Sequence, residues 1–410
     1  MPIFSATIAD RLGALREPNF RLFFLGQAVS RLGDGVAPVA LTFAVLGLTH
    51  SPSDVGFLFA ARSVPLVGFL LIGGVFGDRL PRRRLMLTAD LVRFLSQGLV
   101  AALLIGGRAR LWELLALQAV HGAATAFFSP ALTGLMPAIV SAGRLQEANS
   151  LRGLAASAGN IAGPALAGLL VVAFGAGWAL AVDAASFGIS VAFLARLRLA
   201  PHERLPPQSF LRDLLDGWRE IRARTWLWVV LVVGTLDNFC APAFLVLGAV
   251  VANRSLGGAG AWGLIVTAFG LGSFAGGAVA LRLRPVRPLL TGSLAAAPLV
   301  LLFALLALRA PAVAVAAAAL VAGTANSLFL AVWQTTLQQH VPARSLSRVS
   351  AYEAFGALGL TPVGYALVGP IASQIGIAAT LWAAAAWFMA SACVFVAVKS
   401  VRDLRSPTAS

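Results

Sequence analysis

The sequence is poor in charge and in cysteine. Only 11% of its 410 residues are charged and 59% are hydrophobic, whereas a soluble domain carries about 25% charged residues. A chain of this composition cannot cover a water-facing surface with polar groups, which excludes an ordinary soluble fold. The two cysteines, Cys240 and Cys393, lie inside apolar runs. They therefore predict small buried side chains, and neither a disulfide framework nor a metal site.

Motifs for nucleotide or covalent chemistry are also absent. The sequence has no Gly-x-x-x-x-Gly-Lys-[Ser/Thr] loop, no zinc-ligand spacing and no Gly-x-Ser-x-Gly elbow, which excludes an ATP-driven pump and argues against hydrolase chemistry. No segment between the apolar runs is long enough for a catalytic domain. We therefore expect neither an enzyme nor a cofactor. A membrane-embedded enzyme whose reactive pair meets only in space is the weakest alternative.

What the chain has instead is a series of apolar runs, each long enough for the roughly 20 residues that a membrane-spanning helix needs. They predict an all-α membrane protein with twelve transmembrane helices in two pseudo-symmetric bundles of six. The predicted spans are residues 20–48, 54–80, 85–105, 111–140, 145–174, 178–197, 226–252, 261–283, 288–308, 311–340, 349–371 and 375–398.

The arginines give these spans an orientation. If the N-terminus is cytoplasmic, 24 of the 31 basic residues fall in cytoplasmic segments and only 4 fall outside. The remaining three, Arg31, Arg62 and Arg93, lie within spans. Membrane proteins concentrate basic residues on the cytoplasmic side, so we expect both termini there. The net charge of +15 then reflects short basic loops, and we expect no nucleic-acid partner.

The apolar runs divide the chain into parts. Apolar residues at helical spacing between the two sets of spans predict an amphipathic helix on the inner membrane face. The two sets resemble each other at an offset of about 203 residues, which pairs Asp34 with Asp237. Parallel six-helix repeats are a transporter architecture. We expect a cytoplasmic N-terminus (1–18), a first bundle (19–197), a cytoplasmic linker (198–225), a second bundle (226–398) and a cytoplasmic tail (399–410).

A motif ends the second predicted span. Residues 74–83 read Gly-Val-Phe-Gly-Asp-Arg-Leu-Pro-Arg-Arg, which resembles the signature loop of the major facilitator superfamily, with a proline where a glycine is usual. Glycines allow a close helix contact, and a carboxylate at a helix C-terminus needs positive partners. An ordinary basic loop is the alternative, and a solvated helix end is the alternative for Glu353. The resemblance implies a cytoplasmic gate formed by Gly74, Asp78, Arg79, Arg82 and Arg83, with Glu353 as a further candidate.

The fifth predicted span contains Gly159, Gly163 and Pro164. This pattern resembles the Gly-x-x-x-Gly-Pro element of antiporters in the same superfamily. Glycines four residues apart make a flat face that packs closely, and a proline kinks the helix or frees a carbonyl group. Generic small-residue packing is the alternative.

Ionisable side chains at membrane depth are candidates for proton coupling, because burying them is costly. Asp34 and Asp237 lie near the middle of the first and seventh spans, and Arg31 and Arg62 are placed to reach Asp34. Burial and a neighbouring arginine act on a carboxylate in opposite directions, and their balance lets it take up and release a proton. A static ion pair of Asp34 with one of these arginines is the alternative.

Polar residues of the third and fourth spans complete the set of charges. Asp90 and Arg93 are three residues apart and are expected to pair locally. In drug–proton antiporters of the superfamily an arginine is usual where this chain has Gln118, so the resemblance does not supply that route to proton coupling. His121 is the titratable substitute, and a hydrogen-bonded core histidine is the alternative.

The superfamily resemblance implies that spans one, four, seven and ten line a substrate cavity. A cavity with aromatic walls and few polar groups suits a bulky amphiphilic molecule. A side chain that faces lipid or core is the alternative for Trp333. The cavity candidates are Gln118, Phe127, Phe128, Asn238, Phe239, Trp333 and Gln334.

Two short segments refine the resemblance. Residues 32–34 are Leu-Gly-Asp in the first span, and residues 61–65 are Ala-Arg-Ser-Val-Pro in the second. Here the chain is most similar to twelve-helix bacterial exporters of the macrolide-efflux and enterobactin-exporter types. The similarity implies a monomeric exporter of amphiphilic small molecules in the bacterial inner membrane, coupled to protons. An importer or uniporter is the alternative within transport, and a membrane sensor or scaffold is the alternative outside it.

Overall fold

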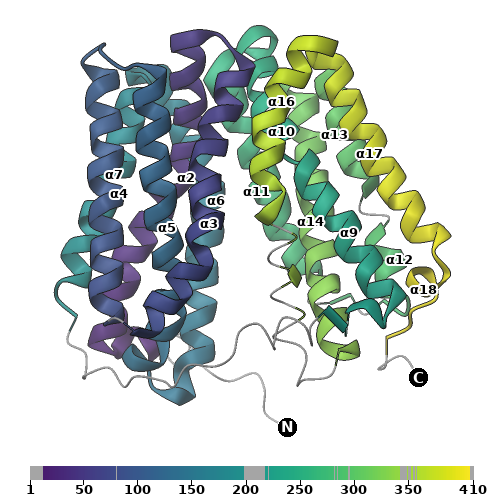
Figure 1. Ribbon diagram of the computed structural model, residues 1–410, viewed down its shortest axis with the longest axis horizontal. Coiled ribbons are helices and arrows are strands. Elements are labelled where there is room, and N and C mark those ends of the chain that lie inside the picture. Colours follow the sequence, from purple (N-terminus) through teal and green to yellow (C-terminus); the bar gives the residue numbers. More distant parts are fainter. Residues whose placement is uncertain are drawn as a thin grey trace. The chain divides into compact units, whose positions relative to one another are not determined.

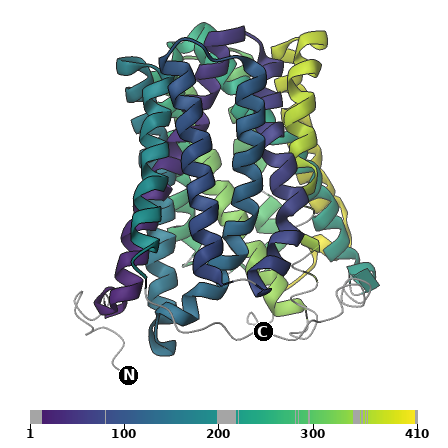
Figure 2. The ribbon, with the colours of Figure 1, turned by 60° about the vertical axis from the view of Figure 1, so that its left-hand side comes forward.

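The regular structure is helical wherever the chain is described (Figures 1 and 2). Ten helical segments there are long and apolar enough to cross a membrane. Large apolar side chains such as Leu169, Val172 and Val313 are exposed on them, which water disfavours and lipid accommodates. The computed structural model describes residues 13–79, 81–197, 218–219, 221–280, 282–283, 285–293, 296–341, 349, 352–353, 356 and 358–406.

The helices group into two units, and Met1–Thr49 with Ala61–Pro206 form the first. Within this unit α2 packs along α6 and α7, and α4 packs along α5 and α7. The packing brings polar residues of α2, α4 and α7 together. The elements are η1 (Gly13–Arg16), α2 (Pro18–Thr49), most of α3 (Pro52–Arg79), α4 (Arg82–Ile105), α5 (Leu111–Ile139), η2 (Ala142–Arg144), α6 (Leu145–Phe174) and α7 (Ala176–Leu194).

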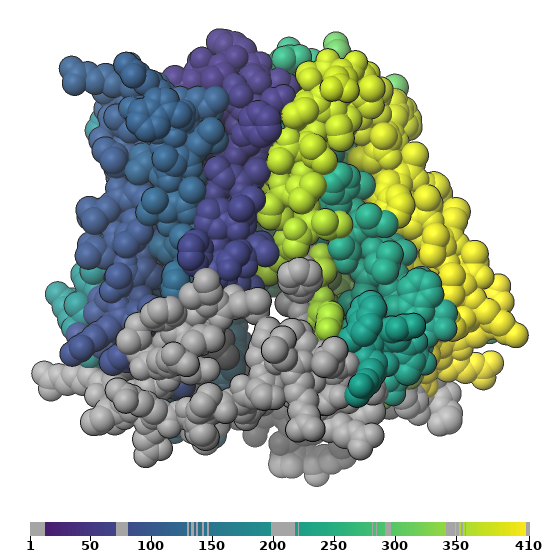
Figure 3. Space-filling model, in the orientation of Figure 1, coloured from purple at the N-terminus to yellow at the C-terminus, as the bar shows by residue number. Residues whose placement is uncertain are grey.

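The second unit comprises His50–Ala60 and Pro207–Ser410. Its main elements are α9 (Thr225–Cys240), α10 (Pro242–Val251), the π-helix η3 (Ala252–Leu256), α11 (Gly258–Ala280), α12 (Pro288–Ser293), α13 (Ala296–Ala307), α14 (Ala312–His340), α16 (Thr361–Ile375), α17 (Ile377–Ala397) and α18 (Lys399–Arg402). Here α11 packs along α14, and α13 packs along α17. Helices α16 and α17, yellow-green and yellow in Figure 3, lie side by side.

One-residue glycine turns join a helix pair in each unit. Gly175 connects α6 to α7 with φ of 88°, and Gly376 connects α16 to α17 with φ of 92°. A residue with a Cβ atom rarely adopts such angles, so glycine is needed to reverse the chain within one residue. The two turns lie 201 residues apart in the sequence, close to the offset of the internal repeat.

Pro242 divides the seventh predicted span into α9 and α10. Helix α9 ends at Cys240 and α10 begins at Pro242, because proline has no N–H for the carbonyl group of Asn238 four residues earlier. Asp237 and Asn238 therefore lie in the last turn before a break in the helix.

Some of the predicted features fall partly outside the described residues. The ninth predicted span contains the described helices α12 and α13. The eleventh overlaps α16, which runs on to Ile375. All three helices are shorter than the ten spanning segments. Of the predicted linker, residues 218–219 and 221–225 are described, and the rest of the predicted amphipathic helix is not. Ile221 is buried, and Trp218 contacts Tyr352 with their ring centroids 5.9 Å apart.

Candidate functional site

A single arginine joins two carboxylates in the core of the first unit. Arg93 on α4 pairs with Asp90 one turn earlier, at 2.8 Å between Nη1 and Oδ1, which confirms the predicted local pair. Its other nitrogen, Nη2, lies 3.4 Å from Oδ1 of Asp34 on α2. The side chain of Asp90 is fully buried and that of Arg93 is 6% exposed. Such charges are stable away from water only when they are paired and hydrogen-bonded.

The surroundings of Arg93 hold its guanidinium in place. Its guanidinium carbon lies 4.3 Å from the ring centroid of Phe187 on α7 and 5.1 Å from that of Phe128 on α5. Asp90 also accepts a 2.6 Å hydrogen bond from the Ser190 hydroxyl, which in turn accepts one from Gln27. Phe128, a predicted cavity residue, thus lies against the arginine, and its side chain is 4% exposed.

Asp34 is the more accessible of the two carboxylates that Arg93 contacts. Its side chain is 22% exposed, against none for Asp90, and the more exposed Arg31 approaches its Oδ2 atom to 3.7 Å. The predicted pair with Arg31 is therefore present, but Asp34 also reaches Arg93 from α4, 59 residues away in sequence. We call Asp34, Asp90, Arg93 and Arg31 the acid–arginine network. It contains two carboxylates and two guanidinium groups, so one added proton leaves a net positive charge.

A second polar chain is fully buried beside the first. Asp183 on α7 accepts a 2.8 Å hydrogen bond from Gln97 on α4, and Gln97 accepts one of 2.9 Å from Gln118 on α5. Within the described part of the chain, Asp183 Oδ1, Gln118 Oε1 and both ring nitrogens of His121 lack a hydrogen-bond partner. Buried polar atoms without partners cost about 1–3 kcal/mol each. The His121 ring is buried against Phe187, as expected of a core histidine, but neither ring nitrogen is hydrogen-bonded to a described residue.

The glycines of the fifth predicted span face α2. A Cβ atom on Gly163 would overlap the backbone of Gly35, and one on Gly159 would overlap the carbonyl group of Arg31. Pro164 is buried in α6. The glycines let α6 approach α2 within one turn of Asp34, which is the close packing expected of this pattern.

The second unit holds its carboxylate differently. Asp237 on α9 accepts a 2.8 Å hydrogen bond from the Trp387 indole and a 3.4 Å bond from the Ser391 hydroxyl, both on α17. It lines a cavity of about 300 Å³ together with Asn238, whose side chain donates to the Gly234 carbonyl. Phe239, the neighbouring candidate, is half-buried and is not among the lining residues.

The cavity candidates on α14 contact Glu353. The Trp333 indole donates to Oε1 of Glu353 at 2.6 Å, and Gln334 donates to the same atom at 2.8 Å. Trp333 is 4% exposed and lies in an apolar cluster with Trp226. Glu353, predicted as a gate residue, is thus linked to two predicted cavity residues. Phe127 is half-buried in the other unit, 6.1 Å from Phe69 between ring centroids.

The predicted gate is described only in part. Helix α3 runs to Arg79 and includes Gly74, but the side chains of Asp78 and Arg79 are not described. Arg82 begins α4. Arg83 donates to the carbonyl groups of Leu194 and Ala195 at the end of α7, where the helix dipole favours a positive charge.

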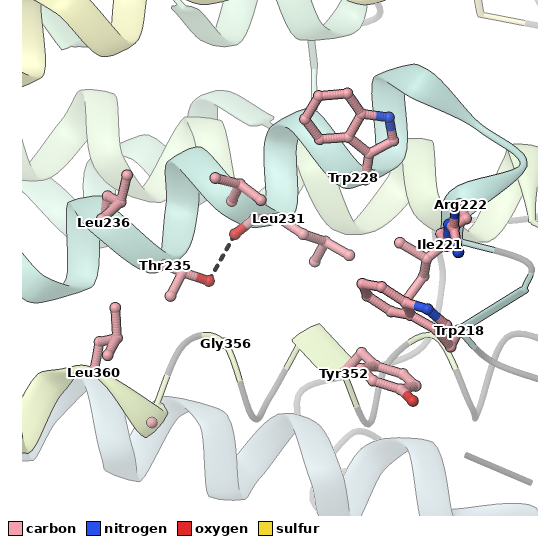
Figure 4. Close-up of a pocket in the computed structure, with 12 residues that line it drawn as sticks. Trp218, Ile221, Arg222, Trp228, Leu231, Thr235, Leu236, Tyr352, Gly356 and Leu360 are labelled. Atoms are coloured by element: carbon pink, nitrogen blue, oxygen red, sulfur yellow. Dashed lines mark hydrogen bonds between the residues drawn. The ribbon is translucent and has the colours of Figure 1, made fainter. Parts of the chain in front are cut away.

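A large apolar groove lies in the second unit, between α9 and the residues before α16 (Figure 4). Its volume is about 910 Å³, and Trp218 and Tyr352 lie at one end near Arg222. The Thr235 hydroxyl within it donates to the Leu231 carbonyl. Apart from Arg222 at one end, most of the lining side chains are apolar. The lining residues are Trp218, Ile221, Arg222, Trp228, Leu231, Val232, Thr235, Leu236, Tyr352, Gly356, Gly359 and Leu360.

Sequence reasoning missed the partners that complete these sites. A signal existed, because Asp90, Arg93 and Gln97 recur at intervals of three and four residues in an apolar run, and so do Asp183, Ser186 and Ser190. Such spacing puts each set on one helix face. Two polar faces in apolar helices are expected to pack against each other, since lipid cannot satisfy them.

The sequence is similar to known bacterial efflux proteins along most of its length. The Multidrug efflux pump Tap of Mycobacterium tuberculosis is 26% identical over 414 residues, which cover 95% of each protein. The Enterobactin exporter EntS of Escherichia coli is 28% identical over 381 residues, covering 87% of this chain and 88% of that one.

Solved structures share the fold at low sequence identity. The nucleoside transporter NupG matches with a TM-score of 0.72 and 14% identity, over 92% of this chain and 98% of that one. A bacterial homolog to the human lysosomal transporter Spinster matches with a TM-score of 0.71 and 15% identity, over 98% of this chain and all of the other. The family model described as transmembrane secretion effector matches residues 9–407, and the chain therefore belongs to this family of major facilitator transporters, which are multi-pass membrane proteins and not enzymes.

Proposed function

We propose that the protein is a secondary active exporter of amphiphilic small molecules that exchanges its substrate for protons by alternating access. The efflux activities named for Tap and EntS support the direction of transport. The family's bacterial efflux members place the protein in the cytoplasmic membrane. The observation that carries the proton coupling is the acid–arginine network around Asp34.

The network offers a way to convert protonation into movement. Asp34 on α2 is shared by Arg93 on α4 and by the more exposed Arg31. A proton on Asp34 removes its attraction for both arginines, and Arg93 keeps only its pair with Asp90. The contact between α2 and α4 then weakens, because a buried charge pair depends on both partners. In this proposal His121 and Arg62 are further coupling candidates, and Asp237 is a second carboxylate at membrane depth.

We propose twelve transmembrane crossings. Ten segments have the required length and apolarity. The other two crossings would be α12 with α13, and the segment that ends with α16, each completed by residues between the described ones. An even number of spans puts both termini on one side, and the basic residues favour the cytoplasm for that side. We expect a monomer, in which residues 198–225 link two bundles (19–197 and 226–398).

The remaining motifs have roles in this cycle. Gly159, Gly163 and Pro164 would keep α6 against α2 during exchange. The gate would involve Asp78 and the arginines that follow it, together with Glu353. The apolar walls of the groove in Figure 4 and of the cavity near Asp237 support an amphiphilic substrate.

Transport in liposomes tests the proposal. Purified protein is reconstituted with a pH indicator inside, and a panel of amphiphilic solutes that includes enterobactin is offered under an imposed pH gradient. We expect gradient-driven movement of at least one solute with a matching proton flux in the opposite direction. Asp34→Asn should abolish the gradient-driven component, because an amide cannot carry the proton. Asp403→Asn, at an exposed carboxylate next to α18, is the matched control.

Other outcomes point to the alternatives. Solute movement at the same rate with and without the gradient, and without proton flux, indicates a uniporter. Proton flux in the same direction as the solute indicates an importer. A protein that binds solutes and moves none of them fits a sensor or scaffold.

A further inference from the structure

The cavity next to Asp237 has aromatic walls. It lies inside the second unit, among α9, α10, α11, α13, α14 and α17. Six of its fifteen lining residues are phenylalanines, and they form three pairs whose ring centroids are 5.5–6.1 Å apart. Its volume of about 300 Å³ is at the lower end of small-molecule pockets. The phenylalanines are Phe244, Phe269, Phe303, Phe329, Phe388 and Phe395.

The cavity contains one charged residue. Asp237 is the single ionisable group among the lining residues, and its hydrogen-bond partners Trp387 and Ser391 are neutral donors. In the part of the chain that the structure describes, Asp237 forms no ion pair, whereas Asp34 and Asp90 of the first unit both contact Arg93. Two neutral donors orient a carboxylate at membrane depth but leave its charge uncompensated.

Aromatic faces and a carboxylate favour the same kind of ligand. The face of a phenyl ring is negative, so it attracts a cation within about 6 Å of its centre. Asn238 and Asn326 are the amides among the lining residues, and they can contact polar atoms of a ligand. An anion of the same shape would meet the ring faces and the carboxylate, and both would repel it.

From these observations we propose that this cavity binds an organic monocation, with Asp237 as its counter-charge and the phenylalanine rings as its walls. The proposal rests on the proposed function in one respect, since the bound cation would be a transported solute. It assigns the charged substrate contact to the second unit. The carboxylates of the acid–arginine network in the first unit already have cationic partners. In this assignment that network serves proton coupling and does not bind the substrate cation.

Equilibrium binding to the purified full-length protein in detergent tests this assignment without transport. Tetraphenylphosphonium is the probe, and tetraphenylborate, which has the same shape and the opposite charge, is its matched control. We expect wild-type protein to bind the cation at least about tenfold more tightly than the anion. Asp237→Asn should weaken cation binding by about tenfold or more, because it removes the charge and keeps the shape.

Three further variants make the result specific. Asp403→Asn removes an exposed carboxylate next to α18 and should leave cation binding within about twofold. Ser391→Ala removes only the longer of the two bonds to Asp237 and should also have a small effect. Phe388→Leu keeps the charge and removes one ring face, and we expect a several-fold loss of cation binding. This variant tests the cavity even if Asp237→Asn fails to fold, which its elution from a sizing column would reveal.

Each outcome bears on the proposal. Equal binding of the two ions, or cation binding unchanged in both Asp237→Asn and Phe388→Leu, overturns it. If cation binding depends on Asp237 but the protein transports none of the solutes, the proposed cation site is supported and the proposed export function is contradicted. If the protein exports other solutes but does not bind the cation, the proposed cation site is contradicted and the proposed export function is not.

Discussion

The two units place a carboxylate at equivalent positions of the internal repeat and surround it with different chemistry. Asp34 on α2 contacts Arg31 and Arg93, and the pair of Arg93 with Asp90 continues into hydrogen bonds from α7. Among the described residues, Asp237 on α9 has no arginine partner: it accepts from neutral donors of α17 and lines a cavity rich in phenylalanines. The comparison teaches that two repeats can keep an acid at the same position and surround it differently. The acid of the first unit has arginine partners, and the acid of the second has neutral hydrogen-bond donors.

One serine on α7 and one on α17 sharpen this contrast. Ser190 on α7 and Ser391 on α17 are 201 residues apart, the same spacing as the glycine turns before their helices. Ser190 donates to a carboxylate at 2.6 Å and accepts from Gln27, whereas Ser391 donates at 3.4 Å. Matching positions thus carry a strong bond in one unit and a weak one in the other.

The largest expected effect comes from removing the shared arginine. Arg93→Leu leaves Asp90 buried without its cation and leaves Asp34 with Arg31 alone. We expect a loss of about 3–5 kcal/mol in stability, as for other buried pairs that lose one partner. Thermal unfolding in detergent measures it, with Arg254→Leu at an exposed arginine as the control. A variant as stable as the control would show that the network is not a structural element of the first unit.

The next effect concerns helix contacts, which we expect to be alike in the two units. Gly163→Val would overlap the backbone of Gly35, and Gly323→Val would overlap the backbone of Phe269. Both should lose about 1–3 kcal/mol, because two backbones must move apart. Gly153→Val, where no atom lies within 4 Å of the new Cβ, is the control. Unfolding temperatures equal to that of the control would contradict the close helix approach.

The smallest effects are expected at the paired serines, and they should differ. Ser190→Ala leaves a buried carboxylate and Gln27 each short of a partner, which costs about 2 kcal/mol. Ser391→Ala should cost less than about 1 kcal/mol, since its bond is long and the Trp387 indole remains. Denaturation of the two variants side by side measures the difference. Equal losses would mean that the two carboxylates are held equally firmly.

Part of the site could be read from local spacing. Asp90 and Arg93 pair because residues three apart share a helix face. The pairs that define the two sites join residues 59, 86 and 150 positions apart, namely Arg93 with Asp34, Gln97 with Asp183 and Trp387 with Asp237. No periodicity within one helix specifies which neighbour it meets. The surroundings of His121 likewise depend on which helices pack around it, here Phe187 of α7.

The sequence by itself determined that this chain is a helical membrane protein, because a lipid environment demands long apolar helices with internally satisfied backbones. It also determined the family, through motifs that lie along the whole chain. Only the tertiary structure decided which acids contact an arginine among the described residues and which, like Asp237, accept from neutral donors there. That choice depends on the rotation and pairing of helices, which are set by glycine contacts such as Gly35 with Gly163 and by the burial of polar faces against one another.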